Sequence, residues 1–182
     1  MEGLKIENVV ASSSMEVNID LVQASKVLEG SEYDREKFPG LIYRIKDPKT
    51  AILLFSSGKV VCTGGKNQDD AKRSVNKVKE LLNEGGLETS NQVDVKVQNI
   101  VASYGLGQDL NLNSVAMTLG LERVEYEPEQ FPGLVYRPRD CDVVLLLFGS
   151  GKMVCTGAKD IPALEEAVDT VKHELKKAGL IH

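Results

Sequence analysis

The chain has no tryptophan, and aromatic residues make up only 5% of it. It has three cysteines, Cys62, Cys141 and Cys155, and an odd number without metal-type spacing predicts free thiols in a reducing compartment. No run of 18 apolar residues occurs, so no membrane span is expected. The first residues lack a basic segment followed by an apolar one, which argues against secretion. We therefore expect a cytoplasmic globular protein.

Residues that commonly carry catalysis are equally scarce. The only histidines, His173 and His182, have no Cys or Asp at a spacing typical of a catalytic triad or a metal site. GGKN at 64–67 lacks the Ser or Thr and the first glycine of a phosphate-binding loop, and GLGQDL at 105–110 lacks the last glycine of a dinucleotide-binding motif. The sequence thus predicts a protein that is not an enzyme and that needs no cofactor or metal.

An excess of positive charge is also missing. The chain has 22 Lys and Arg against 27 Asp and Glu, a net charge of −5. A protein that binds nucleic acid through charge alone usually carries a basic excess. Any binding of nucleic acid by this chain must therefore depend on a local surface.

What the sequence does contain is an internal repeat. Residues 38–64 match residues 131–157 at 17 of 27 positions, and IENVVAS at 6–12 matches VQNIVAS at 97–103. A repeat of this kind decides the architecture. We predict two copies of one unit, residues 1–91 and 92–182.

Each copy predicts the same order of elements. An alternating strand precedes a short helix, for which Asp20 is the expected N-cap in the first copy and Asn111 in the second. Three apolar strands follow, the last two joined by the turn SSGK at 56–59, and a long helix from Asn67 to Gly85 closes the first copy. The fold class is α+β, with an antiparallel sheet and helices on one face.

The strands are apolar on both faces, although a sheet covered by helices on one side needs only one apolar face. In AILLFSSGKVVCT, Leu54 and Cys62 share one parity and can face the helices, whereas Leu53 and Val61 have the other parity. Two arrangements explain the second apolar face. Two sheets could stack as a sandwich, or the face could be an open interaction surface. The lack of further helices to cover the face favours the open surface.

Three motifs give the chain a specific resemblance. QNIVAS at 98–103, YEPEQFPGLVYR at 126–137 and LLLFGSGKMVCTGAK at 145–159, each with a partner in the first copy, resemble the TATA-box-binding proteins, general transcription factors of archaea and eukaryotes. The lack of a long N-terminal extension is more similar to the archaeal members. The resemblance implies a two-repeat saddle with one continuous curved antiparallel β-sheet, whose concave face binds DNA and whose convex face carries the helices.

The resemblance also implies how the saddle works. It binds the minor groove of double-stranded TATA-box promoter DNA, where A·T pairs offer only hydrogen-bond acceptors and where an apolar surface leaves a guanine amino group unpaired. The residues that would contact DNA are Asn8, Val10, Phe38, Arg44, Leu53, Phe55, Lys59, Val61 and Thr63 in the first repeat, and Asn99, Val101, Phe131, Arg137, Leu146, Phe148, Lys152, Val154 and Thr156 in the second.

The four phenylalanines form two equivalent pairs. By pattern alone, a Phe beside a Pro-Gly turn is more typical of a core plug. The resemblance instead implies that the rings insert at the two end steps of the element and kink it. It also places Arg44, Arg137, Lys59 and Lys152 on phosphates at the rim.

The segment before the second Phe-Pro-Gly is unusually acidic. EYEPEQ at 125–130 sums to −3, whereas EYDREK at 32–37 sums to −1. By pattern alone this is an ordinary solvated loop. The resemblance implies that it contacts transcription factor B, which in turn recruits RNA polymerase. The contact residues would be Glu125, Glu127, Glu129 and Gln130, with Gln130 replacing the leucine common in eukaryotic members.

Three other functions compete with this interpretation. The curved sheet could hold an apolar ligand against the helices, an aromatic sheet could stack single-stranded RNA, or the chain could be the related domain of a repair glycosylase. Self-association of the empty apolar surface is a further expectation. If the source is archaeal, we expect a cytoplasmic, nucleoid-associated protein, and a nuclear one if it is eukaryotic.

Overall fold

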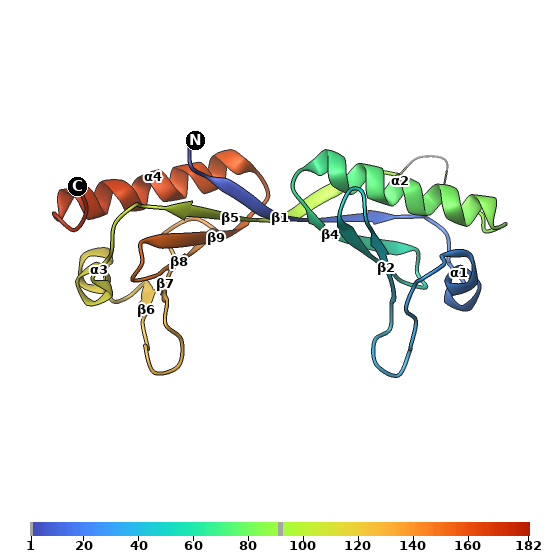
Figure 1. Ribbon diagram of the computed structural model, residues 1–182, viewed down its shortest axis with the longest axis horizontal. Helices are drawn as coiled ribbons and strands as arrows, with labels where there is room; N and C mark the ends of the chain where they lie inside the picture. Colours follow the sequence, from blue (N-terminus) through green and yellow to red (C-terminus); the bar gives the residue numbers. More distant parts are fainter. Residues whose placement is uncertain (1, 91–92) are drawn as a thin grey trace. The chain divides into compact units, whose positions relative to one another are not determined.

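Figure 1 shows the computed structural model of the chain, which describes residues 2–90 and 93–182. The expected boundary between the repeats, at 91/92, lies outside these described residues. By their contacts the described residues divide into two compact units. We call Asn8–Gln98 the N-unit, and Asn99–His182 together with the residues before Asn8 the C-unit.

The N-unit is an antiparallel sheet packed on helices, with strand order β2-β3-β4-β1. Its elements are β1 (Lys5–Ser14), α1 (Leu21–Val27), β2 (Leu41–Ile45), β3 (Thr50–Leu54), β4 (Lys59–Gly65) and α2 (Gln68–Glu84). Helix α2 packs on β3 and β4, and α1 packs beside α2 (Figure 1).

The C-unit repeats this arrangement with strand order β5-β9-β8-β7-β6. Its elements are β5 (Lys96–Gly105), α3 (Leu112–Leu119), β6 (Val124–Glu125), β7 (Leu134–Tyr136), β8 (Val144–Leu147), β9 (Lys152–Ala158) and α4 (Ile161–Lys177). Strands β1 and β5 each contribute residues to both units. The predicted antiparallel α+β class is confirmed in each unit.

The helices begin where the sequence predicts. The Asp20 carboxylate accepts hydrogen bonds from the backbone N–H groups of Val22 and Gln23 at 3.0 and 3.2 Å, which caps α1. In the C-unit, the Asn111 side chain caps α3 in the same way, by accepting from the N–H of Ser114. These caps satisfy backbone donors that a helix leaves unpaired at its first turn.

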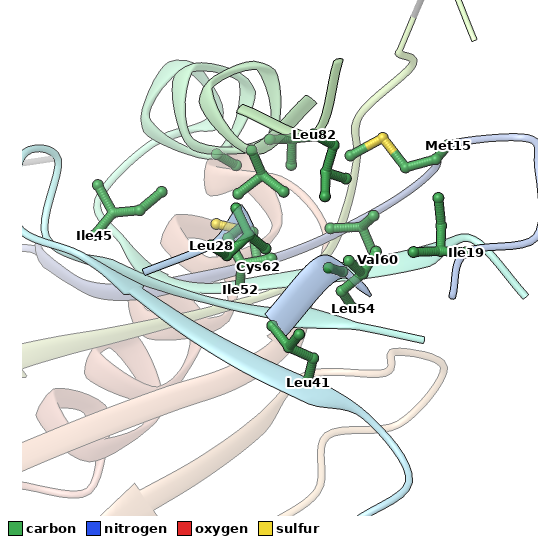
Figure 2. Close-up of a cluster of buried hydrophobic side chains, with 14 of the residues drawn as sticks. Met15, Ile19, Leu28, Leu41, Ile45, Ile52, Leu54, Val60, Cys62 and Leu82 are labelled. Atoms are coloured by element: carbon green, nitrogen blue, oxygen red, sulfur yellow. The ribbon is translucent and has the colours of Figure 1, made fainter. Parts of the chain in front are cut away.

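The core of the N-unit lies between the sheet and its helices (Figure 2). Ile52, Leu54, Val60 and Cys62 are all fully buried there, as their parity predicts. The stripe on α2 that faces them is also buried, and so is its counterpart on α4: Ala71, Val75, Val78 and Leu82, and Leu164, Val168, Val171 and Leu175. Each buried Leu or Val stabilises the fold by roughly 1.5–3 kcal/mol, so these faces anchor the sheet to the helices.

Strands β4 and β9 carry one irregularity that the sequence does not reveal. On β1 and β4, Val9 pairs with Gly65 but Ala11 pairs with Cys62, so β4 has one extra residue at this point. Gly64 lies in the bulge with φ at +96°, a conformation that favours glycine. The C-unit has the same bulge in β9, where Gly157 also has a φ of +96°.

No helix within residues 2–90 and 93–182 is both long and apolar enough to cross a membrane. The same described residues contain no group of three or more His, Cys, Asp or Glu placed to hold a metal ion.

Candidate nucleic-acid interface

The side of each sheet opposite its core is an apolar surface with an amide in it. We call Asn8, Val10, Leu53, Val61 and Thr63 the N-face, and their equivalents Asn99, Val101, Leu146, Val154 and Thr156 the C-face. Every one of these side chains is half-buried. A sandwich core would bury them completely, so the structure favours the open surface.

Cross-strand pairing brings the members of the N-face together. Leu53 on β3 lies opposite Val61 on β4, and Ala51 lies opposite Thr63. In the C-unit, Leu146 lies opposite Val154, and Val144 lies opposite Thr156. Each face is therefore a continuous patch, because directly opposed side chains in an antiparallel pair are about 5 Å apart.

The asparagine of the N-face is held in one orientation. The backbone N–H of Gly64, in the β4 bulge, donates to Asn8 Oδ1 at 2.6 Å, and Asn8 Nδ2 donates to Thr63 Oγ1 at 3.1 Å. Because only the amide oxygen can accept from Gly64, Nδ2 lies on the Thr63 side. An amide nitrogen carries two hydrogens, so Asn8 keeps a second one to donate.

The C-face repeats this cluster. Gly157 N–H donates to Asn99 Oδ1 at 2.7 Å, and Asn99 Nδ2 donates to Thr156 Oγ1 at 3.0 Å. The bulge therefore explains why the asparagine and the threonine are at these positions. The bulge turns one backbone N–H toward the amide oxygen. The amide nitrogen is therefore the atom that can still donate a hydrogen bond to a ligand.

The four phenylalanines pack as two pairs. The ring centroids of Phe38 and Phe55 are 5.8 Å apart with the planes at 60°, and those of Phe131 and Phe148 are 5.9 Å apart at 68°. Phe131 is 42% exposed and the other three rings are half-buried. The interpretation as core plugs is therefore wrong, since none of the four rings is buried.

A glycine forms the base of each ring pair. A Cβ atom on Gly133 would lie 2.8 Å from the Phe131 ring and 2.9 Å from the Phe148 ring. On Gly40, a Cβ would lie 2.9 Å from Phe38 and 3.0 Å from Phe55. Real Cβ atoms do not approach so closely, and the glycine of each Phe-Pro-Gly motif is thus what lets the rings pack over the backbone.

The loops that carry Phe38 and Phe131 have matching backbone turns. Phe131 N–H donates to the carbonyl of Glu127, and Phe38 N–H donates to the carbonyl of Asp34, each at 3.0 Å. Figure 1 shows the loop between β6 and β7 extending from the sheet on the side away from α4. Glu127, Glu129 and Gln130 are exposed on it.

Glu125 lies in the short strand β6, and not in the loop where the sequence analysis places it. It pairs with Val135 on β7, a contact that local sequence does not signal. Its carboxylate is 3.8 Å from Arg137 Nε, and in the N-unit Glu32 is 3.0 Å from Arg44. Both pairs are well exposed and contribute at most about 1 kcal/mol, so the arginines can exchange these partners for phosphates at little cost.

Two lysines complete the basic residues expected at the rim. Lys59 begins β4 and Lys152 begins β9, and both are exposed. Each follows a turn whose glycine, Gly58 or Gly151, has a positive φ. The turn predicted by SSGK is therefore confirmed, and GSGK at 149–152 forms its equivalent in the C-unit.

The sheet register adds to these faces several residues that the sequence pattern alone did not identify. Ile42 lies opposite Leu53, and Val135 lies opposite Leu146. Ala51 and Val144, opposite the two threonines, also belong there. The alternation within β2 and β7 could have identified Ile42 and Val135.

Two of the three thiols are held in the core. Cys62 and Cys155 are buried, and burial raises the pKa of Cys62 and raises that of Cys155 to about 11. Cys141 is exposed. An open hollow of about 790 Å³ in the N-unit is lined by charged residues such as Arg44, Lys46 and Lys49 together with Ile45 and Ala51, and it gives no specific support to the apolar-ligand alternative.

Comparison with known proteins identifies a family for this chain. A family model described as "Transcription factor TFIID (or TATA-binding protein, TBP)" matches residues 3–85 and 94–178. The TATA-box-binding protein of Picrophilus torridus is 57% identical over 181 residues, covering 100% of this chain and 98% of the relative. That of Archaeoglobus fulgidus is 54% identical over 178 residues, covering 98% of this chain and 97% of the relative.

A solved structure of the same family is also similar to this chain. "Methanococcus jannaschii TBP" is similar with a TM-score of 0.87 and 44% sequence identity, over 96% of this chain and 98% of that one. This match confirms the expected fold. The relatives named here are archaeal and belong to a family of transcription factors without enzymatic activity, as the sequence predicts. The chain belongs to the TATA-box-binding protein family.

Proposed function

We propose that this protein is a general transcription initiation factor that binds the minor groove of TATA-box promoter DNA through the N-face and the C-face. One observation carries the proposal. Twice in the chain, an apolar sheet face contains an asparagine whose amide is fixed with one N–H to spare, and the same unit carries a partly exposed pair of phenylalanines.

The faces suit A·T pairs in two ways. Adenine N3 and thymine O2 are acceptors, and Asn8 and Asn99 each have a hydrogen to donate to them. A guanine amino group placed against Leu53 or Val61 would be desolvated without an acceptor. That costs about 1–3 kcal/mol, so a G·C pair is disfavoured.

The phenylalanine pairs suit the ends of the element. Unstacking one base step costs about a few kcal/mol, and burying a Phe ring recovers roughly 1.5–3 kcal/mol. Two rings together can therefore offset one kink. Because pyrimidine–purine steps such as TA unstack most easily, the kinks add to the preference for TATA sequences.

The acidic loop suits a protein partner. Glu127 and Glu129 are exposed beside Gln130, and a basic segment of transcription factor B is the expected contact. RNA polymerase would then be recruited indirectly. For an archaeal protein with these partners, we propose a place in the cytoplasm with the nucleoid.

A binding comparison tests the main proposal. A gel-shift titration would use a TATA duplex, the same duplex with G·C substitutions, and the two single strands. We expect tight binding to the first alone. Equal affinity for the TATA and G·C duplexes would refute minor-groove recognition, and preference for single strands would support RNA-type stacking instead.

A second experiment tests the partner loop. Glu127→Arg should leave TATA binding intact and weaken the ternary complex with transcription factor B, because it reverses one exposed charge on the loop. Asp34→Arg is the matched control, since Asp34 is the equivalent residue of the N-unit. Equal weakening of both complexes by Glu127→Arg would contradict a role restricted to the partner.

A further inference from the structure

Ser12 and Ser103 occupy equivalent positions beside the two faces. Ser12 on β1 lies opposite Val61, and Ser103 on β5 lies opposite Val154. Both side chains are half-buried, and on each strand they follow the parity of the asparagine and valine of the face. A hydroxyl at this position therefore adjoins whatever binds there.

The hydrogen of the Ser103 hydroxyl is already used. Ser103 Oγ donates to Glu7 Oε1 at 2.7 Å, within the C-unit. Lys5 Nζ also lies 3.9 Å from this oxygen, as a partly exposed ion pair. A carboxylate can only accept hydrogen bonds, so the direction of this bond is fixed and Ser103 has only lone pairs left to offer.

Ser12 has the opposite arrangement. Its partner is Gln98, the equivalent of Glu7, and Gln98 Nε2 donates to Ser12 Oγ at 2.8 Å within the N-unit. Because the amide supplies the hydrogen of this bond, the Ser12 hydroxyl keeps its own hydrogen to donate. Two identical serines thus differ in hydrogen-bonding polarity because one neighbour is Glu and the other is Gln.

We propose that Glu7 is a positioning residue for specificity, which makes the C-unit accept a G·C pair at the position beside Ser103, whereas the N-unit requires A·T beside Ser12. The inference rests on the proposed function. Adenine N3 and thymine O2 accept a hydrogen bond from Ser12 but repel the lone pairs of Ser103. The guanine amino group, the one donor in the minor groove, is the group that Ser103 can accept.

The consequence is directional binding. The two faces are otherwise nearly equivalent, so they give little preference for either direction on a symmetric element. A single G·C pair in one half of the element removes that symmetry. The C-unit then binds the half with the G·C pair and the N-unit binds the other half.

The test uses a palindromic TATA element and a set of duplexes in which a single G·C pair is placed at each position of one half in turn. For the intact protein, we expect one position at which the G·C pair weakens binding much less than at the others. Glu7→Gln, a change of nearly equal size, should increase the penalty at that position by about fivefold or more. It should also tighten binding to the unsubstituted element, since an amide that donates to Ser103 as Gln98 donates to Ser12 leaves the Ser103 hydrogen free.

Two matched variants distinguish a change in the hydrogen-bonding polarity of the serines from a general structural effect of the substitution. Gln98→Glu should lower the penalty of the same G·C pair on the N-unit side, because Ser12 then becomes an acceptor. Ser103→Ala should abolish the effect of Glu7→Gln on the penalty, whatever it does to affinity. A merely structural role for Glu7 would change all duplexes alike, and that result would overturn the inference.

The direction in which the protein binds the DNA can be measured in a separate experiment. Cys141 is exposed and lies in the C-unit, whereas Cys62 and Cys155 are buried, so a DNA-cleaving reagent can be attached to Cys141 selectively. We expect equal cleavage at both ends of the palindrome and cleavage biased to one end on the tolerated G·C duplex, with the bias lost in Glu7→Gln. No bias, or a bias that Glu7→Gln keeps, overturns the inference. Because discrimination between TATA and fully G·C duplexes is measured in parallel, failure of the proposed function would be recognised separately.

Discussion

The Asn8 amide combines two functions that belong to different atoms. Its oxygen accepts from Gly64 N–H in the β4 bulge, and its nitrogen points to Thr63 with one hydrogen left over. The first bond is part of the fold, and the spare hydrogen is what DNA would use. A substitution can therefore remove one function and keep the other.

Asn8→Asp should separate them. Aspartate keeps an acceptor for Gly64 N–H but has no hydrogen to donate, and it places a negative charge beside the DNA. We expect the free energy of unfolding in urea to change little and TATA affinity to fall at least about tenfold, since a charged acceptor then faces the base acceptors in place of a donor. Asn8→Ala should lower both quantities, with a stability loss of about 1 kcal/mol. Identical behaviour of the two variants would contradict the division of roles.

Gly133→Ala tests the support of the second ring pair. The added Cβ would lie 2.8 Å from Phe131 and 2.9 Å from Phe148, so the rings must shift. We expect a smaller DNA bend, measured as energy transfer between dyes at the duplex ends. Gly105→Ala is the control, because a Cβ there meets nothing within 4 Å. An unchanged bend in Gly133→Ala would show that the packed ring positions do not matter for kinking.

At the residue scale, the sequence predicts which side chains lie on the outer faces but not their hydrogen bonds. Alternation within a strand places Asn8 and Val61 on the correct face. It cannot show that Gly64 orients the amide, or that Ser12 and Ser103 have opposite polarity. Those contacts join residues more than 50 positions apart, and they depend on the register of the folded sheet.

At the scale of elements, the two faces of β3 have different roles, and the adjacent residues Leu54 and Leu53 lie on opposite faces. Leu54 is fully buried against the helices, and Leu53 lies opposite Val61 on the N-face. Leu54→Ala should lower the free energy of unfolding by about 2–5 kcal/mol, because it opens a cavity in the core. Leu53→Ala should cost much less stability and weaken TATA binding instead.

Urea unfolding measures the stability of Leu53→Ala and Leu54→Ala, and DNA titration measures their TATA affinity. Leu147 and Leu146 on β8 provide an independent repeat of it in the C-unit, since Leu147 is buried and Leu146 is half-buried. Equal destabilisation by Leu53→Ala and Leu54→Ala would mean that the N-face belongs to the core.

Elements with local sequence signals were predicted correctly, whereas β6 and the two bulges, which arise only from pairing with distant strands, were not. Asp20 and Asn111 cap their helices because a short polar side chain bonds to backbone two or three residues ahead. Strand β6 consists of two residues and exists only because it pairs with β7. The bulges in β4 and β9 likewise depend on distant partners, β1 and β5.

At the scale of the whole molecule, net charge opposes the proposed function, since the chain carries −5 and its proposed ligand, DNA, is a polyanion. The apolar faces resolve this, because most of the contact they offer is independent of charge. The four basic residues expected at the rim, Arg44, Lys59, Arg137 and Lys152, are all exposed. Two of them are paired with glutamates in the free protein.

Salt dependence should therefore be shallow. With four phosphate contacts, the logarithm of the TATA binding constant should fall with the logarithm of salt concentration with a slope of about −3 to −4. A binder with ten contacts would give about −9. Titrations between low and moderate salt measure the slope. A value near −9 would show that charge, and not the apolar surface, dominates binding.

Strands β4 and β9 share an irregularity that their hydrophobic pattern does not require. Both have the extra residue at the same point, with a glycine at the same φ of +96°. Gene duplication copies irregular features together with regular ones, and independent origin at one position in both halves would be a coincidence. Equivalent bulges in both halves fit duplication of a single unit that already oriented its asparagine through the bulge. Differences such as Glu7 against Gln98 record how the two descendants diverged afterwards.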